Sequence, residues 1–236
     1  MEKRETEIRK PGTFGRAVAA DRLRDPFDEY NEQIVRLEAW PDLVILGDSI
    51  MERWDAALYL APYGLRVENR GIGGDTTEYM AKRLEADVLQ LRPRAAVLCG
   101  GINDMMGAQD DLWWQKPGRD EKTVTEEICR NLEDMALRCE AAGILPILAT
   151  VHRCDLCQPW DNGKSDRILT AENDFLRELT ARHGWPLLDW AACFERDGEK
   201  RIREDAVDGV HPDWNGYVLM RDALVACLRA CGILKE

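Results

Sequence analysis

The stretch Leu43-Val44-Ile45-Leu46-Gly47-Asp48-Ser49 decides the interpretation of this chain. Its apolar part predicts a strand that is buried on both faces, and Gly-Asp-Ser predicts a sharp turn into a helix near Ile50. Such a turn places the hydroxyl of Ser49 at the N-terminus of that helix, where unpaired backbone N–H groups favour developing negative charge. Ser49 is therefore a candidate nucleophile.

Similar apolar runs recur along the chain and alternate with segments of helical period. We expect strands at Leu43–Leu46, Leu65–Asn69, Ala95–Cys99, Ile144–Thr150 and Trp185–Asp189. Nearly continuous hydrophobicity is typical of parallel strands with helices on both faces. The pattern therefore predicts the α/β class.

Helix signals fill the gaps between these strands. They are Asp25-Pro26, the capping boxes Asp75/Glu78 and Thr123/Glu126, the stop at Gly143, a helix over Asp166–Arg182 and a last helix after Asp213. Two stretches, Met105–Asp120 and His152–Ser165, resist this scheme and follow predicted strands. Ligands of open α/β sheets bind at the edge formed by the carboxyl ends of the strands, so we expect these loops to shape a pocket.

The length of 236 residues predicts one domain, because α/β folds of this size are commonly single. We place this domain at residues 25–236. Residues 1–24 are expected to form an N-terminal arm, either loose or packed on a neighbour.

The charge balance limits the partners. Lys and Arg number 32 and Asp and Glu 44, a net charge of -12, which speaks against nucleic acid and anionic membrane surfaces as partners. No apolar run is long enough for membrane insertion. A small molecule is the expected partner.

The expected localisation is cytoplasmic. The first 25 residues are charged throughout and lack the apolar segment of a secretory signal, so the eight cysteines are expected to be thiols. A secreted protein whose signal has been removed would carry the same sequence.

A serine nucleophile needs a base, and the chain has three histidines. His183 stands where a helix end is expected, and His152 follows a strand. His211 lies three residues after Asp208, with Gly209 allowing a tight turn, so Asp208 can accept the Nδ1 proton while Nε2 faces Ser49. Alone, Asp-x-x-His is a weak pattern.

Acyl transfer also needs hydrogen-bond donors for the oxyanion. The Ser49 N–H is one candidate, the Gly74 N–H in Gly71-Ile72-Gly73-Gly74-Asp75 a second, and the Asn103 amide in Gly100-Gly101-Ile102-Asn103-Asp104 a third. Both glycine-rich segments end predicted strands at the same edge. Taken separately, each of these glycine clusters is more often just a turn.

Together and in this order, the four segments resemble the SGNH hydrolases, also called the GDSL esterase/lipase family. The resemblance runs from about Leu43 to Tyr217, and its Gly-Ile-Gly-Gly-Asp-Thr-Thr stretch is most similar to the branch of the platelet-activating-factor acetylhydrolase α subunits. One departure is Ile50, where many members have Leu.

The resemblance implies a flavodoxin-like three-layer α/β/α sandwich with a five-stranded parallel sheet. It assigns catalysis to Ser49, Asp208 and His211, and the oxyanion hole to Ser49, Gly74 and Asn103. It implies neither a metal nor a cofactor, and it leaves a homodimer open.

Further residues are candidates for substrate binding: Asp48, Trp113, Trp114, His152 and Trp160. The tryptophans could instead close the loops or form a subunit interface. Asp48 and Asp104 are expected mainly to brace their loops by hydrogen bonds.

Cys154 and Cys157 form a Cys-x-x-Cys pair in the second loop. We expect free thiols, because a zinc site would need a fourth ligand beyond His152 and no second such pair exists. Zinc or a disulfide remains the alternative.

The predicted function is a serine esterase acting on a small acyl or acetyl ester, with an acetylated carbohydrate or a lysolipid as candidate substrate. The alternatives are an acyltransferase that uses the same serine and a non-catalytic binding module. A nucleotide or flavin binder would need a phosphate-cradling loop after the first strand, where this chain carries Asp48 and Glu52.

Overall fold

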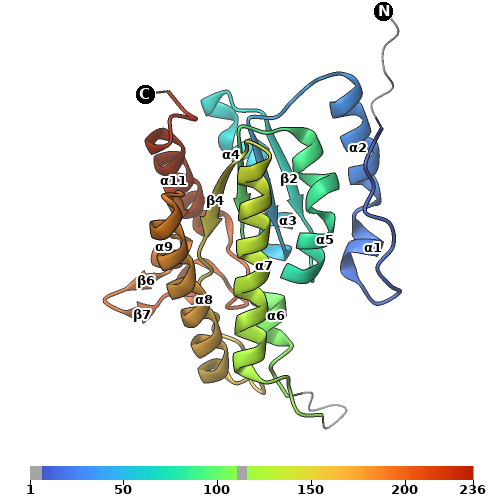
Figure 1. Ribbon diagram of the computed structural model, residues 1–236. Coiled ribbons are helices and arrows are strands. Elements are labelled where there is room, and N and C mark those ends of the chain that lie inside the picture. The colour runs from blue at the N-terminus through green and yellow to red at the C-terminus, as the bar shows by residue number, and fades with distance from the viewer. Residues whose placement is uncertain (1–6, 111–115, 236) are drawn as a thin grey trace, which may run out of the picture.

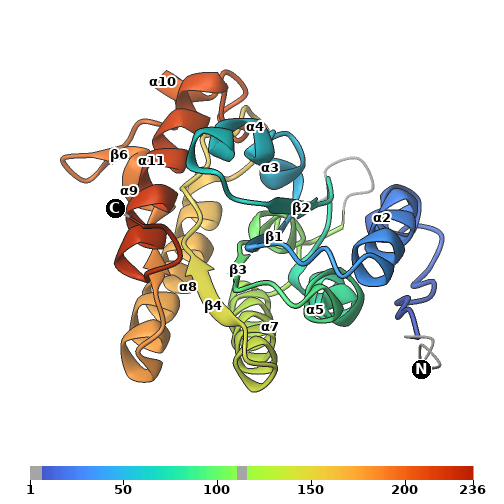
Figure 2. The same ribbon diagram turned by 90° about the horizontal axis from the view of Figure 1, so that it is seen from above.

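The computed structural model describes residues 7–110 and 116–235. Its centre is a parallel sheet with the strand order β2-β1-β3-β4-β5 (Figures 1 and 2). The strands are β1 (Leu43–Gly47), β2 (Val67–Gly71), β3 (Ala95–Leu98), β4 (Leu145–Ala149) and β5 (Leu187–Leu188). A short antiparallel hairpin, β6 (Glu195–Arg196) and β7 (Glu199–Lys200), stands apart from it.

Helices cover both faces of the sheet. They are α1 (Ala19–Leu23), α2 (Asp25–Arg36), α3 (Ser49–Glu52), α4 (Ala56–Leu60), α5 (Thr77–Asp87), α6 (Ile102–Met106), α7 (Glu121–Ala141), α8 (Asn162–His183), α9 (Trp190–Cys193), α10 (Ile202–Asp205) and α11 (Trp214–Ala230), with 3-10 turns η1 (Ala61–Tyr63) and η2 (Leu89–Leu91). The layer of α5, α7 and α8 lies on one face, and α3, α4 and α11 lie on the other (Figure 2). The predicted three-layer α/β/α sandwich is confirmed.

Strand β1 occupies the position that its apolar sequence predicts. Residues 43–46 have no exposed surface, and the strand pairs with β2 on one side and β3 on the other. The order of the sheet reverses at β1, since the chain moves first to β2 and then back across to β3. Crevices at such a reversal are the usual ligand sites of open α/β sheets.

Strand β2 lies two residues later than predicted, at Val67–Gly71 instead of Leu65–Asn69. The prediction followed the apolar residues, but this edge strand is largely polar. Its Asn69 amide donates to the carbonyls of Met51 (2.6 Å) and Trp54 (2.8 Å). Such distant hydrogen bonds satisfy polar strand residues and leave no trace in the local pattern.

Helix α5 does not begin at the predicted box of Asp75 and Glu78. It begins at Thr77, whose N–H donates to the carboxylate of Asp104 (3.0 Å). The Asp75 carboxylate accepts from Arg83 instead (2.8 Å). A tertiary ion pair has therefore replaced the expected local cap.

Two more helices begin earlier than predicted, because an aspartate upstream is the actual cap. Asp120 accepts from the Thr123 N–H (2.9 Å) at the start of α7. Asp161 accepts from the Lys164 N–H (3.0 Å) at the start of α8. The predicted stop at Gly143 and the start of α11 after Asp213 are confirmed.

The N-terminal segment packs against the turn that follows β2. Val18, Ala19 and Ala20 are buried and form a small apolar cluster with Ile72. A separate arm ending at residue 24 stays a prediction.

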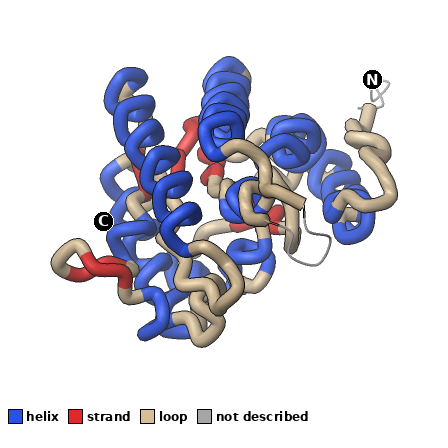
Figure 3. The backbone as a smooth tube through the Cα atoms, turned by 90° about the horizontal axis from the view of Figure 1, so that it is seen from below, coloured by secondary structure: helices blue, strands red, loops and turns tan. Residues whose placement is uncertain are grey.

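The loops that follow the strands gather at one edge of the sheet. Helix α6 and the start of α7 mark this lower edge in Figure 1, and Figure 3 looks onto it. Three of the sequence segments singled out above directly follow β1, β2 and β3 here. The fold thus brings them side by side.

Candidate active site

Ser49 is the first residue of α3, directly after the end of β1. The carboxylate of Asp48 caps the helix by accepting from the Ile50 N–H (2.9 Å). The capped turn fixes the serine where strand and helix meet, at the carboxyl edge of the sheet.

The Ser49 hydroxyl meets the imidazole of His211, 162 positions further along the chain. Ser49 Oγ lies 2.8 Å from His211 Nε2, and His211 Nδ1 lies 2.7 Å from Asp208 Oδ2. The other oxygen of Asp208 accepts the backbone N–H groups of Val210 (2.9 Å) and His211 (2.7 Å). One carboxylate therefore shapes the turn and orients the imidazole.

The charge state of Asp208 fits this arrangement. Partial burial would raise its pKa, but the hydrogen bonds from His211 and Val210 outweigh burial and bring the pKa to about 2. An ionised Asp208 accepts the Nδ1 proton, which leaves His211 Nε2 as the acceptor for the Ser49 hydroxyl.

The turn that carries His211 needs a glycine, as predicted. Gly209 has φ +76°, and a side chain there would overlap the carbonyl of Asp155. The Gly209 carbonyl accepts from the Asp155 N–H (2.9 Å). The His211 loop is thus fastened to the loop after β4.

His152 holds the loop that carries His211 through a hydrogen bond to its backbone. It is buried, and its Nε2–H donates to the carbonyl of Val210 (2.7 Å). Burial lowers the pKa of His152 to about 4, so the imidazole is neutral at pH 7. Its side chain is occupied inside the protein, and we do not propose that it contacts substrate.

The candidate oxyanion donors lie on the neighbouring loops. Gly74 is the third residue of a turn closed by the Asp75 N–H donating to the Ile72 carbonyl (3.1 Å), and its φ of +80° is one that side chains disfavour. Asn103 donates one amide N–H to the Asp75 carbonyl (2.9 Å). That bond orients the amide and leaves its second N–H for a ligand.

The two aspartates expected to brace their loops do so. Asp104 accepts from the Thr77 N–H (3.0 Å) and hydroxyl (2.7 Å), and burial raises its pKa to about 6. Asp48 is buried, and desolvation raises its pKa to about 7. Buried under its own helix cap, Asp48 is not proposed as a substrate contact.

The remaining substrate-binding candidates lie on the two loops. Trp113 and Trp114 fall outside the described residues. Trp160 is half-buried, and its backbone N–H donates to the Cys157 carbonyl (3.3 Å).

Glu172 is a buried acid that the sequence analysis missed. It lies on α8 without exposed surface, and neither carboxylate oxygen has a hydrogen-bond partner among the described residues. A side chain at Gly101 would overlap this carboxyl group, so Glu172 lies directly under the segment that carries Asn103. Burial, together with the charges of Asp104 and Asp48, raises its pKa well above the ordinary value.

Arg53 is a second residue that the sequence analysis missed. Its Nη1 lies 3.7 Å from Asp208 Oδ2, with both side chains half-exposed. It also lines a cavity of about 430 Å³ beside α3, together with Phe27 and Asn69. The Arg53 guanidinium thus lies beside Asp208, next to the Ser49–His211 pair.

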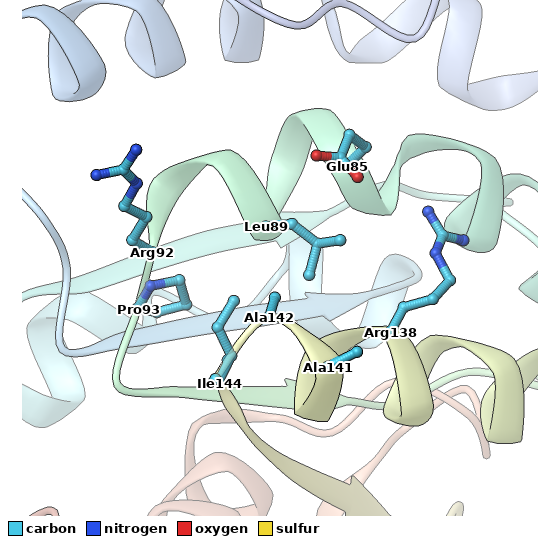
Figure 4. A pocket seen from close by; sticks show the side chains of 9 residues that line it. Glu85, Leu89, Arg92, Pro93, Arg138, Ala141, Ala142 and Ile144 are labelled. Carbon is cyan, nitrogen blue, oxygen red and sulfur yellow. The ribbon is translucent and has the colours of Figure 1, made fainter.

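A cavity of about 580 Å³ lies at the opposite edge of the sheet. Glu85 and Leu89 line it from one side and Arg138 of α7 from the other (Figure 4). Pro93 and Ile144, which shortly precede β3 and β4, also line it. It opens at the amino ends of the strands, away from Ser49.

Cys154 is buried, Cys157 is exposed, and both carry free thiols. Within residues 7–110 and 116–235, no three His, Cys, Asp or Glu side chains gather in a way that could hold a metal ion. Over the same ranges, no helix combines the length and the apolar character needed to cross a bilayer.

Comparisons with known proteins identify the family and the relatives of this chain. Residues 45–219 match the GDSL-like lipase/acylhydrolase family. The uncharacterized lipoprotein YqeF of Bacillus subtilis (strain 168) is 27% identical in an alignment of 172 residues, and the match covers 65% of this chain and 67% of that protein. The cytoplasmic localisation stays a prediction.

Two solved structures are similar to the chain. A lipase/acylhydrolase from Enterococcus faecalis has a TM-score of 0.62 and 27% identity, covering 82% of this chain and 96% of that chain. A GDSL-like lipase from Bacteroides thetaiotaomicron VPI-5482 has a TM-score of 0.68 and 21% identity, covering 87% and 99% respectively. The second likeness shows a shared fold.

The family match includes every residue of the proposed site, from Ser49 to His211. The chain therefore belongs to the GDSL-like lipase/acylhydrolase family, the SGNH hydrolases that its four motifs resemble.

Proposed function

We propose that the chain hydrolyses carboxylic esters through an acyl-serine intermediate on Ser49. The observation that carries this proposal is the chain of short contacts from Ser49 Oγ through His211 to Asp208, 2.8 and 2.7 Å long. A hydroxyl, a base and an ionised carboxylate in this order are what nucleophilic acyl transfer requires.

The proposed reaction has two halves. Ser49 Oγ attacks the ester carbonyl carbon while its proton passes to His211 Nε2, and the C=O electron pair becomes an oxyanion. The N–H groups of Ser49 and Gly74 and the Asn103 amide stabilise this charge. The C–O bond then breaks, and His211 gives its proton to the departing alcohol.

Deacylation repeats the sequence with water. His211 takes a proton from water as the water oxygen attacks the acyl-serine carbonyl. As the resulting intermediate collapses, the bond to Ser49 Oγ breaks and His211 returns that proton to Ser49. Asp208 stays ionised throughout and stabilises the imidazolium. Loss of an acyl group as the free acid completes the cycle.

We further propose a small acyl or acetyl ester as the substrate, with a carbohydrate or lysolipid alcohol. This finer assignment rests on the motif resemblance. A panel of p-nitrophenyl acetate and octanoate, followed by acetylated sugars and lysolipids, tests it by comparing kcat/KM. Transfer to an added alcohol acceptor, seen as a new ester product, would instead favour the acyltransferase alternative.

The chain offers a clean test of the nucleophile, because Ser49 and Ser165 are its two serines. Ser49→Ala should lower kcat by roughly 10⁴-fold or more and abolish labelling by a fluorophosphonate. Ser165 is buried and bonded to Gln109 (2.9 Å), so Ser165→Ala is the matched control and should keep labelling. Full esterase activity in Ser49→Ala would contradict the mechanism.

A further inference from the structure

Arg83 of α5 is a fully buried cation that lies behind the candidate oxyanion donors. Its side chain has no exposed surface, nor does that of its partner Asp75. Arg83 Nε donates to Asp75 Oδ2 (2.8 Å), and Nη1 donates to Asp87 Oδ2 (3.1 Å). Its Nη2 donates to two backbone carbonyls, those of Gly47 (3.1 Å) and Arg70 (2.8 Å).

Those carbonyls belong to the two strands that meet at the site. Gly47 ends β1, two residues before Ser49, and Arg70 is the next-to-last residue of β2. A guanidinium is a rigid planar fork of donors, so bonding both carbonyls through one nitrogen fixes the two strand ends relative to each other. The sheet already pairs Gly47 with Gly71, and the Gly47 carbonyl also accepts the Ile72 N–H (3.1 Å). Arg83 adds a buried side-chain constraint to this junction between the Ser49 turn and the turn after β2.

The Asp75 contact carries the same constraint to the donors themselves. Asp75 directly follows Gly74 and closes its turn through the N–H bond to Ile72 (3.1 Å). Its carbonyl accepts the Asn103 amide (2.9 Å). A displacement of Asp75 would thus move the Gly74 N–H and the Asn103 side chain together.

Stability alone is a weak reason for this arrangement, because a buried ion pair contributes little net stability relative to apolar packing. Asp87, moreover, does not depend on Arg83 as its partner. It also accepts from Arg24 (2.8 Å) and Asn31 (3.0 Å). The contacts unique to Arg83 are those to the strand ends and to Asp75.

We infer that Arg83 is a positioning residue for ester hydrolysis: it holds the Gly74 N–H and the Asn103 amide in register with Ser49. This inference rests on the proposed function. Arg83 touches no reacting atom and acts through Asp75 and the two strand ends.

The test is a double-mutant cycle with Arg83→Lys and Asn103→Ala, measured on p-nitrophenyl acetate. Lysine keeps the charge but cannot make the forked contacts, so Arg83→Lys should lower kcat roughly 10–100-fold with KM within about 3-fold. In the Asn103→Ala background the same change should cost several-fold less than in the wild type, because one of the two donors that it positions is already gone.

Arg24→Lys is the matched control. Arg24 is a buried arginine of the same network, bonded to Asp87 and Asp28, and it makes no contact with the strand ends. Its replacement should lower Tm while leaving kcat within about 2-fold. Should Arg83→Lys fail to fold, Asp75→Ala removes the acceptor of the Arg83 Nε–H and should lower kcat with the same non-additivity toward Asn103→Ala.

Two results would overturn the inference. One is an Arg83→Lys enzyme with a lowered Tm and an unchanged kcat, and the other is a loss that is fully additive with Asn103→Ala. Wild-type protein without Ser49-dependent esterase activity would refute the proposed function and the inference with it. A wild type that is active and silenced by Ser49→Ala separates the two cases.

Discussion

The two halves of the proposed site are held in place by different means. The donor half, Gly74 and Asn103, is anchored to fully buried charges through Asp75. The base half sits on a surface loop, where the Asp208 side chain is 50% exposed. The geometry of the donor half is therefore tied to the fold of the sheet, whereas that of the base half depends on a few hydrogen bonds between loops.

The largest effect within this comparison is expected at Asp208. Asp208→Asn keeps the shape of the side chain but removes the charge that selects the tautomer of His211, so kcat should fall on the order of 10³–10⁴-fold. Because Asp208 is half-exposed, Tm should change little. Steady-state kinetics check the loss of kcat, and thermal unfolding checks the Tm. A large loss of Tm would show that the base half, like the donor half, is tied to the stability of the fold.

The pKa of about 2 adds a pH criterion. A depressed pKa means that the carboxylate is present at all pH values above about 3, and its contribution is lost only as the pH falls through about 2. Asp208 itself should therefore stay ionised between pH 5 and 7, which the carboxyl chemical shift of Asp208, followed by NMR from pH 2 to 7, checks. A carboxyl titration with its midpoint above pH 4 would contradict this expectation.

Asn103 tests the donor half. Asn103→Ala should lower kcat on the order of 10²–10³-fold with a small change in KM, since the amide acts on charge that develops in the transition state. Asn103→Asp is the matched variant, because it keeps the shape and replaces the donor by an acceptor. It should be slower than Asn103→Ala, and equal activities would argue that Asn103 serves only to bond the Asp75 carbonyl.

His152 tests how far the base half depends on its supporting loop. His152→Phe fills the space but leaves the Val210 carbonyl without its donor (2.7 Å in the native protein), so kcat should fall by about 10-fold, the worth of one buried hydrogen bond. His183→Phe is the control, because His183 ends α8 just before β5, at the amino edge of the sheet and away from the site, and stacks on Trp185. Equal kinetics of the two variants would mean that the His211 loop keeps its position without the hydrogen bond from His152.

The comparison also explains what the sequence could and could not predict. Ser49, Gly74 and Asn103 were found because each follows a strand and is of a type that chemistry requires there. Asp208 and His211 were found because they lie three positions apart in one turn. These are local signals, and the structure brings Ser49 and His211 to 2.8 Å as predicted.

Arg83 and Glu172 left no such signal. Each is a charged residue in the middle of a helix, where a charge usually marks a solvent-facing position. Only the fold shows that the partners of Arg83 come from β1 and β2 and that Glu172 lies under Gly101. The polar strand β2 was misplaced for the same reason, since its partners are distant in sequence.

Glu172 sets the smallest and sharpest prediction, because it concerns stability alone. Its pKa is raised by burial, with Asp104 and Asp48 adding to the effect, so the folded protein retains a proton that the unfolded chain releases above pH 4.5. Stability from this group is therefore fully present below that pH and is lost as the pH rises toward the folded pKa.

Glu172→Gln, a neutral isostere, should abolish that loss of stability. Its Tm should match that of the wild type near pH 4.5 and exceed it by several degrees at pH 8, since each kcal/mol corresponds to about 2–4 °C. Glu178→Gln on the exposed side of the same helix is the control and should follow the wild type at both values. A wild type and a Glu172→Gln variant with parallel Tm profiles would show that this carboxyl group finds a charge partner inside the fold, and the donor half would then be no more sensitive to pH than the base half.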